Sequence, residues 1–480
     1  MYFSRRFARA CAIAVLLAGP AVRAQSSPTA PLRDTLKLSL GDAVSIAMRQ
    51  SDEVGISAAQ VDVADALYGT ARANLLPQLR LTTSYVHVYE SARGQAVGTV
   101  FNQPNTYTGN LNLSQTLFQG GRLLSASRSA DELRKAARFD ESEQRSVLTL
   151  QVARSYLQVL FANRIAELQD QNLTLASSRL TQVEQFERAG RAARYDVLRS
   201  RVERSNIEPL AIQAHNDLEL ARLELKRVLN LPVEQPISLV TKIDSAAAAG
   251  LIAGVTDTSS VAERASIRSA ELNVASKRLG VTVARADFYP TVSVFLQSGY
   301  QAFPAIGQGF PRASGALTEA ACPPGGAAGR LCQNGGFFSD RQAGLNISMP
   351  VFDGFRVRSN LDLAQAQTRL AELQLRQQRE AVSVDVARAR AELRRSSAVF
   401  AARQQNSQEA DEAFRLATLR FTRGLSTQLE VSDAQVALLT AQSTEARATF
   451  DLFLASADLA RALGRPIPLP SSALTPAASR

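Results

Sequence analysis

The chain has no tryptophan, two histidines and three cysteines among its 480 residues. His87 and His215 are far apart in the sequence, and neither is close to a cysteine. The sequence also lacks a nucleophile elbow, a phosphate-binding loop and any metal-ligand spacing, which are the patterns that familiar catalytic chemistry requires. We therefore expect no enzymatic activity, no cofactor and no bound metal.

Long apolar runs are also missing. After residue 24 no stretch of about 18 apolar residues occurs, so no transmembrane helix is expected. Residues 1–24 combine an N-terminal arginine cluster with a short apolar run and small residues before Ala24. This pattern predicts a secretory signal peptide that is cleaved after Ala24. A twin-arginine signal is the weaker alternative, because the residues after Arg5 and Arg6 fit that pattern poorly.

The charge balance does not favour a nucleic-acid partner. Lys and Arg total 54 and Asp and Glu total 44, a net charge of +10. Residues 1–24 hold four arginines and no acids, so the mature chain has 50 basic residues against 44 acidic ones, or +6. The remaining arginines are scattered among acids along helical patterns, as on a solvated face. Because no basic patch is interleaved with aromatics, we expect no nucleic-acid binding.

Two cysteines remain after cleavage of the signal peptide. Cys322 and Cys332 lie in the Gly/Pro-rich segment CPPGGAAGRLC. In an oxidising compartment, a disulfide across a surface loop is the favoured interpretation. A metal-binding pair is the weaker one, because no histidine is near in sequence.

Two segments of the chain are nearly the same. Residues 111–122 read LNLSQTLFQGGR and residues 345–356 read LNISMPVFDGFR, a spacing of 234 residues that also separates Gly190 from Gly424. Farther upstream the spacing is 213 residues, so the second copy holds about 21 additional residues, within the stretch 302–336. Such spacing indicates a tandem repeat.

Each copy contains two long helical patterns. The first of each pair is uninterrupted, whereas Pro209 interrupts the second pattern of the first copy. No Gly or Pro occurs between Gly121 and Gly190 or between Gly354 and Gly424, and apolar residues recur there at helical spacing. Helices of about 100 Å, at a rise of about 1.5 Å per residue, occur as coiled coils or helical arrays. We expect an antiparallel hairpin in each copy that turns at a glycine. The predicted helices cover about 120–188 and 191–229, and about 354–422 and 425–463.

A period of two precedes each long helix and predicts strands. The predicted strands cover about 77–90, 105–117, 290–300 and 339–350. Each has about 10 residues, the length that a tilted membrane strand requires. Four strands alone would leave open sheet edges in lipid, so other copies of the chain must close the sheet. The periodicity predicts an oligomeric barrel with long helical hairpins in the aqueous compartment.

The predicted organisation follows from these patterns. It consists of a signal peptide at 1–24, a first repeat at 25–240, a linker at 241–260, a second repeat at 261–466 and a C-terminal tail at 467–480.

In its order of motifs, the mature chain resembles the TolC family of outer-membrane efflux proteins. The resembling segments are LSLGDAVSIAMRQS at 38–51, ARANLLPQL at 71–79, ARADFYPTV at 284–292, the repeated F-x-G-x-R and RFTRGLSTQLEVSDAQ at 420–435. The resemblance implies a mixed α/β membrane protein in the outer membrane of a Gram-negative-type bacterium, in contact with its lipid. It further implies a homotrimer with a twelve-stranded β-barrel that continues as an α-helical barrel in the periplasm.

The resemblance also implies a function and partners. The chain would be a passive conduit for efflux of small molecules or for type I protein secretion. A periplasmic adaptor, or membrane fusion protein, would dock on it, and an inner-membrane transporter of the RND, ABC or MFS type would supply energy. The sequence does not distinguish among drug, metal and protein cargo. The rival from another class is a periplasmic coiled-coil adaptor or structural scaffold, which normally has one hairpin in a β-rich domain.

The family's adaptor-docking tips correspond to the two glycine turns. This similarity assigns docking to Ala189, Gly190 and Arg191 in the first copy, and to Arg423, Gly424, Leu425 and Ser426 in the second. The alternative is a plain turn between helices, which would need glycine equally.

Two acids follow the second turn. Glu430 and Asp433 are three residues apart and share a helix face. If that face lines the pore, threefold symmetry makes two acidic rings that favour cations, and the family has acidic rings at these positions. The alternative is a solvated pair on the helix surface.

Gating residues are implied by the same resemblance. Closed family members hold their inner hairpins with an aromatic hydroxyl and an arginine bonded to an aspartate. Asp196 matches the aspartate, but Phe421 replaces the tyrosine and Ser426 replaces the arginine. We therefore expect a more loosely closed tip.

Overall fold

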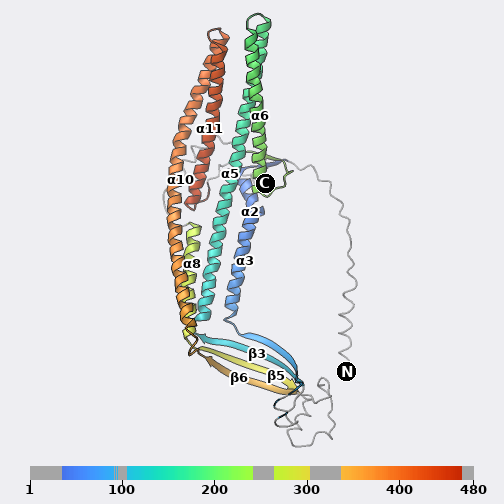
Figure 1. Ribbon diagram of the computed structural model, residues 1–480, viewed down its shortest axis with the longest axis vertical. Coiled ribbons are helices and arrows are strands. Elements are labelled where there is room, and N and C mark those ends of the chain that lie inside the picture. The colour runs from blue at the N-terminus through green and yellow to red at the C-terminus, as the bar shows by residue number, and fades with distance from the viewer. Residues whose placement is uncertain are drawn as a thin grey trace, which may run out of the picture.

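The computed structural model describes residues 35–90, 105–241, 264–302 and 337–467, together with residues 92 and 95. The predicted signal peptide lies outside these residues, as do Cys322, Cys332 and nearly all of the predicted linker, insertion and tail. The chain is elongated, with a four-stranded sheet at one end and two helical hairpin tips at the other (Figure 1).

Two pairs of long helices make up most of the described part of the chain. In the first half, α5 (Arg122–Arg188) has 67 residues and α6 (Arg194–Val228) has 35. In the second half, α10 (Arg356–Thr422) has 67 residues and α11 (Gln428–Ala462) has 35. At about 1.5 Å per residue, α5 and α10 are each about 100 Å long. The lengths recur because both halves lack helix-breaking residues over the same span, apart from Pro209 within α6.

Both long helices end in the same way. Gly190 and Gly424 adopt left-handed φ angles of 70° and 75°. The amide of Gly190 donates to the carbonyl of Glu187 and that of Arg191 to the carbonyl of Phe186, the bond pattern of a Schellman motif. Gly424 and the residue after it repeat this pattern. Each hairpin therefore turns where a residue without Cβ is required.

The strands form one antiparallel sheet. Its order is β2 (Gln78–His87), β3 (Asn105–Gln119), β5 (Thr291–Ala302) and β6 (Phe337–Ser348). Every neighbouring pair is antiparallel. The two strands of each half are neighbours, and the halves meet at β3 and β5. Strands β2 and β6 are the edges of the sheet, and each has one unpaired side.

A layer of four helices continues from the sheet. Helix α3 (Asp52–Ala73) packs on α5, α5 packs on α8 (Ala265–Arg285), and α8 packs on α10. A short 3-10 turn, η3 (Ala286–Phe288), joins α8 to β5. Figure 1 shows these helices in this order, with α3 and α10 on the two outer sides. Helices α3 and α8, which the periodicity did not predict, widen the layer near the sheet.

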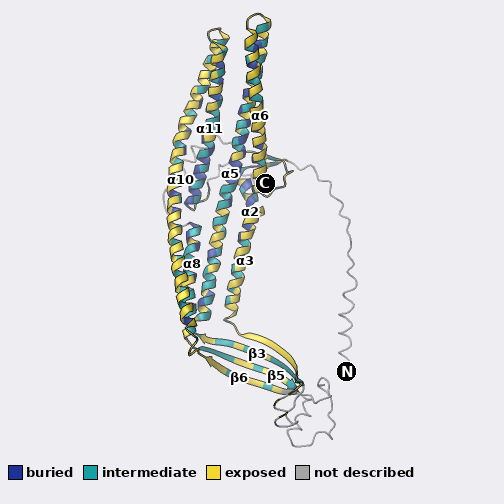
Figure 2. Cartoon of the chain, in the orientation of Figure 1, coloured by how far each residue is buried: buried dark blue, intermediate teal, exposed yellow. Residues whose placement is uncertain are grey.

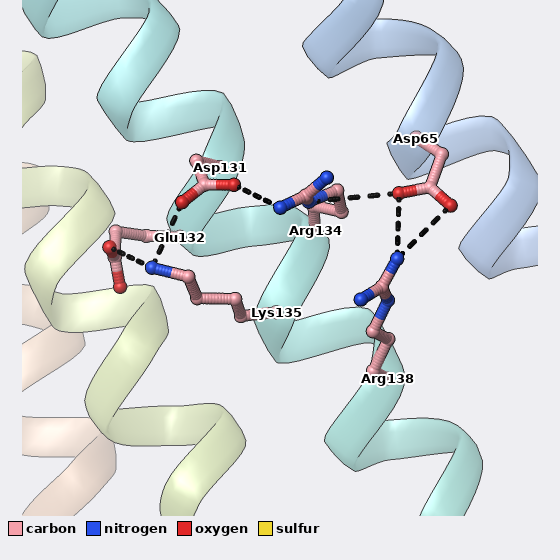
Figure 3. A network of polar contacts seen from close by, with 6 residues as sticks. All are labelled: Asp65, Asp131, Glu132, Arg134, Lys135 and Arg138. Carbon is pink, nitrogen blue, oxygen red and sulfur yellow. Dashed lines mark hydrogen bonds and ion pairs between the residues drawn. The ribbon is translucent and has the colours of Figure 1, made fainter.

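Charged side chains join α3 to α5 (Figure 3). Asp65 of α3 forms ion pairs with Arg138 at 3.4 Å and with Arg134 at 3.7 Å. On α5, Arg134 also contacts Asp131 at 2.6 Å, and Asp131 accepts a bond from Lys135 at 2.9 Å. The hydrogen bond from Lys135 lowers the pKa of the Asp131 carboxyl. The chain of ion pairs therefore connects the two helices.

The main apolar core lies near the middle of the molecule. There α2 (Leu40–Gln50) packs on α5 and α6, beside a small parallel sheet of β1 (Leu36–Leu38) and β4 (Ile237–Leu239). Tyr156 of α5 is fully buried in this core. Its hydroxyl is 2.9 Å from the carbonyl oxygen of Leu38 and 2.9 Å from Oγ1 of Thr241. Tyr156 therefore ties the ends of the first repeat to the long helix.

A glycine joint connects the sheet to α5. Gly120 has a φ of 55°, and a Cβ there would lie 2.8 Å from the carbonyl oxygen of Ala286. Next to it, Arg122 forms an ion pair with Asp287 of η3. The corresponding Gly354 has a φ of 67°, but a Cβ at that position would meet no atom within 4 Å. The first joint is therefore packed against the second repeat, whereas the second is open.

A buried arginine joins the two repeats. Arg264, at the start of α8, is 7% exposed. Its guanidinium is 3.0 Å from Glu143 of α5 and 3.4 Å from Asp385 of α10. Arg461 of α11 lies 3.7 Å from the same Glu143. One carboxylate thus holds two arginines from the second repeat.

A separate charged contact joins α5 to α11. Arg154 lies 3.7 Å from Asp458. Burial raises the pKa of the Asp458 carboxyl, and the attraction of Arg154 and Arg461 only partly opposes this effect. The ionised carboxylate is therefore less favourable in the folded chain than in water.

Much of the surface of the single chain is apolar and exposed. Figure 2 shows exposed residues along the whole of α10 and along β2. Among the helices in the described part of the chain, none combines the length and apolarity needed to cross a membrane.

Candidate functional site at the hairpin tips

The first tip is the turn between α5 and α6. Ala189, Gly190 and Arg191 are all exposed there. The Arg191 guanidinium lies over the ring of Phe186, 4.9 Å from its centroid. This contact holds a positive charge at the tip against the end of α5.

The second tip is the turn between α10 and α11. Arg423, Gly424 and Leu425 are exposed, and 67% of Leu425 is accessible. Ser426 is half-buried, and its hydroxyl donates to the carbonyl of Ala417 at 3.4 Å. The second tip therefore presents a large apolar side chain to solvent.

The two predicted aperture acids differ in their surroundings. Glu430 and Asp433 are both exposed on the first turns of α11. Glu430 faces Arg420 of α10, with Nη1 and Oε2 3.7 Å apart. Asp433 has no ion pair among the described residues. The negative charge of Glu430 is therefore partly neutralised within the chain, whereas that of Asp433 is not.

The predicted gating aspartate has a local role. Asp196 accepts a hydrogen bond from the amide of Ala193 at 3.1 Å. Since Ala193 has no side-chain acceptor, Asp196 supplies the polar group at the start of α6. Phe421 and Ser426 lie at the end of α10 and in the following turn, and both are half-buried. Within the described part of the chain, no hydrogen bond or ion pair joins either of them to Asp196.

Other side chains connect the two hairpins below the tips. Gln428 of α11 donates to the hydroxyl of Ser200 on α6 at 2.7 Å. One turn farther along α11, Ser432 donates to the carboxylate of Glu203. Glu203 also faces Arg179 of α5 at 3.5 Å. Burial lowers the pKa of the Arg179 guanidinium, and Glu203 opposes that effect.

A buried amide pair lies deeper between the hairpins. Gln435 donates to Oδ1 of Asn172 across α11 and α5, and both residues are buried. These inter-hairpin residues were not predicted from the sequence. The available signal was a polar residue in an apolar stripe, because Gln435 occupies the helical position between buried Val431 and Leu438.

The tips contain exposed charged, polar and apolar side chains. The described residues hold no group of three or more His, Cys, Asp or Glu side chains that could bind a metal ion. What the arrangement offers is an exposed apolar turn, an unpaired carboxylate and a set of breakable polar contacts between two hairpins.

Comparison with known proteins identifies relatives that match most of the chain. The profile of the family described as "Outer membrane efflux protein" matches residues 43–231 and 258–465. The pyoverdine export outer membrane protein OpmQ of Pseudomonas putida is 28% identical over 442 residues, which cover 88% of this chain and 85% of that protein.

Solved structures share the fold. The outer membrane protein VceC of Vibrio cholerae has a TM-score of 0.70 at 21% identity, over 89% of this chain and 97% of VceC. A structure of CusC has a TM-score of 0.72 at 17% identity, over 90% of this chain and 94% of CusC. The arrangement of sheet and long helices is therefore the fold of these two proteins.

Proposed function

This chain belongs to the outer membrane efflux protein family, and we propose that three copies of it form one passive channel. Its twelve strands cross the outer membrane, and its helices continue the passage through the periplasm. A periplasmic adaptor and an inner-membrane transporter of the RND, ABC or MFS type deliver the substrate. The chain itself is a transport protein and not an enzyme.

One observation carries this proposal. A four-stranded sheet whose strands are 10 to 15 residues long leaves both of its edges, β2 and β6, unpaired. Open edges are not tolerated in lipid, because every backbone polar group there needs a partner. Pairing β6 of one copy with β2 of the next closes a ring, and three copies give a twelve-stranded barrel, within the range of bacterial barrels.

The helix layer supports the same head-to-tail assembly. Its outer helices are α3, which leads into edge strand β2, and α10, which follows edge strand β6. On α3, Ile56, Val63 and Leu67 are about 60% exposed, and their spacing of seven and four residues places them on one face. On α10, Leu363 and Leu370 are exposed one heptad apart. Packing α10 of one copy against α3 of the next would bury both stripes.

The proposals about docking and cargo rest on similarity to related proteins. We propose that the exposed turns at Gly190 and Gly424 contact the adaptor, with Leu425 as the apolar anchor of the second turn. The Pseudomonas putida relative is named for pyoverdine export, and on that resemblance we favour a small organic solute over a secreted protein as the cargo.

Closure of the tip is proposed to depend on the contacts between hairpins. Phe421 has no hydroxyl, Ser426 has no charge and Asp196 is engaged at its own helix start. The restraints therefore move to Gln428 with Ser200 and to Ser432 with Glu203. These are neutral or singly charged bonds, each contributing about 1 to 2 kcal/mol, so the closed tip opens readily.

The decisive experiment combines assembly with conduction. Native mass spectrometry of the purified full chain is expected to give three copies, and planar bilayers are expected to show discrete channels with measurable resting conductance. A non-conducting monomer rejects the channel. A conducting trimer with very low resting conductance rejects the readily opened tip alone.

Three variants separate the tip from the channel body. Ser432→Ala removes a bond between hairpins and should raise resting conductance. Thr440→Ala removes a hydroxyl that, among the described residues, bonds only to the carbonyl of Val436 on its own helix and should leave conductance unchanged. Leu425→Asp should abolish co-purification with an adaptor while conduction persists.

A further inference from the structure

The two faces of the sheet differ in chemistry. Register places Arg80, Asn112, Gln297 and Gln342 in one row across all four strands, and this face is rich in amides. The next row holds Leu81, Leu111, Ser298 and Arg341 on the opposite face. The apolar side chains on that opposite face include Leu79, Leu81, Leu111, Leu296, Tyr85 and Tyr300, all of which are exposed. In a barrel this is the face that meets lipid.

Arg341 is out of place on the apolar face. It is exposed and, within the described residues, has neither a hydrogen bond nor an ion pair. No acidic residue occurs in β2, β3 or β5, and Asp340, the acid of β6, belongs to the amide face, where Gln297 and Gln301 donate to it. An edge strand β2 from a second copy would also bring no acid. A strand neighbour therefore cannot neutralise this guanidinium.

The surroundings of Arg341 form a groove. A hollow of about 400 Å³ is lined by Leu79, Leu111, Leu113, Leu296, Ser298, Arg341 and Ala343, together with Gln297 and Gln342. Ser298 lies directly opposite Arg341. Tyr300 is two residues farther along β5 on the same face, the diagonal position that a long side chain can reach. A guanidinium and two hydroxyls thus lie at the edge of a leucine-lined surface.

The level of Arg341 along the strand indicates which leaflet it meets. Ser348 is the end of β6 nearest the helices, and Phe337 is the far end. Arg341 is four residues from that far end, which is roughly 10 Å along the membrane normal for a tilted strand. Tyr85 and Tyr107 stack 4.7 Å apart nearer the same end, as aromatic residues do at a membrane interface. Arg341 therefore lies just inside the outer interface.

We propose that Arg341, with Ser298 and Tyr300, binds the phosphate of an anionic lipid in the outer leaflet. The inference rests on the proposed outer-membrane barrel. A guanidinium binds phosphate oxygens through two parallel hydrogen bonds, and its aliphatic stem can extend along the leucines toward the interface. The acyl chains lie on Leu79, Leu111 and Leu296. A free anion gains nothing from these leucines, so the groove favours a lipid over dissolved phosphate.

The test uses the full chain in nanodiscs of phosphatidylcholine with a minor fraction of bisphosphorylated lipid A. Native mass spectrometry after release measures the lipid A that stays bound. Arg341→Gln is expected to reduce retention about tenfold, the effect of one charge-assisted hydrogen-bond pair. Arg80→Gln removes the same charge from the amide face of the sheet and should leave retention unchanged.

Further arms make the result decisive. Dephosphorylated lipid A should be retained no better by the wild type than by Arg341→Gln, and Arg341→Lys should keep most of the binding. Equal retention by Arg341→Gln and wild type, an equal loss with Arg80→Gln, or displacement of lipid A by inorganic phosphate would each overturn the proposal. Single-channel conductance is measured in parallel. Its absence in the wild type would reject the proposed channel, and not the lipid site alone.

Discussion

Asp433→Asn is expected to reduce the cation preference of the channel more than Glu430→Gln does. Both acids are exposed at the start of α11, but Glu430 has Arg420 at 3.7 Å and Asp433 has no such partner among the described residues. A paired carboxylate acts on a passing ion as a dipole, whose field falls more steeply with distance than that of a single charge. In the proposed pair of acidic rings, Asp433 would therefore have the larger effect on a passing cation.

The magnitude follows from the exposure of these groups. Side chains of Arg420 and Glu430 are 59% and 48% exposed, so a dielectric close to that of water applies. An ion about 4 Å from one unpaired charge then gains about 1 kcal/mol, or roughly fivefold in occupancy. Asp433→Asn should lower the cation preference by about this factor and Glu430→Gln by less. Arg420→Gln should raise it, because it releases the charge of Glu430.

Reversal potentials of single channels in a KCl gradient measure this preference. Glu187→Gln is the matched control, because Glu187 pairs with Arg194 at the same 3.7 Å on the first hairpin and lies outside the predicted aperture. The reasoning is refuted if Glu430→Gln shifts the reversal potential as far as Asp433→Asn does. It is also refuted if Arg420→Gln has no effect while Glu187→Gln does.

Three further outcomes concern the body of the molecule. Glu143→Gln should lower the free energy of unfolding by about 3 kcal/mol, because it leaves the 7% exposed Arg264 without its nearest carboxylate; an unchanged thermal midpoint of the helical circular-dichroism signal contradicts this. Gly120→Ala should destabilise the folded chain by more than about 2 kcal/mol, since the added methyl meets a backbone oxygen at 2.8 Å. Gly354→Ala should destabilise it by about 1 kcal/mol, for its left-handed φ alone. Equal melting temperatures of the two variants would show that packing at the joint is unimportant. The carboxyl of Asp458 has a raised pKa in the folded chain, so between the ordinary and the raised pKa the folded state binds more protons than the unfolded chain. The free energy of unfolding should therefore rise as pH falls from neutrality through the raised pKa. Asp458→Asn should be more stable than the wild type near pH 7, and its melting temperature should lack this rise as pH falls.

The sequence predicted the long helices and strands because each depends on local chemistry. A stretch without Gly or Pro between Gly121 and Gly190 permits one helix, and the glycine at its end permits the turn. Strand alternation before each helix is equally local. Helices α3 and α8 were not predicted. In the structure they widen the helix layer near the sheet, with α3 on its outer side and α8 between α5 and α10.

The tip residues show more clearly what could not be predicted from the sequence. The acids Glu430 and Asp433 were identified as a pair on one helix face, and in sequence they are equivalent. Arg420 distinguishes them only because the turn at Gly424 brings α10 beside α11. Likewise, the sequence gives no sign that Gln428 bonds to the other hairpin, because its partner Ser200 is 228 positions away.

By itself, the sequence determined the periodicities, the tandem repeat and its resemblance to the outer membrane efflux proteins, because these depend on the order of residues along the chain. Only the tertiary structure decided which charges meet. Arg264 reaches Glu143 and Asp385 from positions far apart in sequence, and the antiparallel register places Arg341 beside Ser298. Contacts of that kind depend on how helices and strands pack side by side, and the sequence carries no local signal of that arrangement.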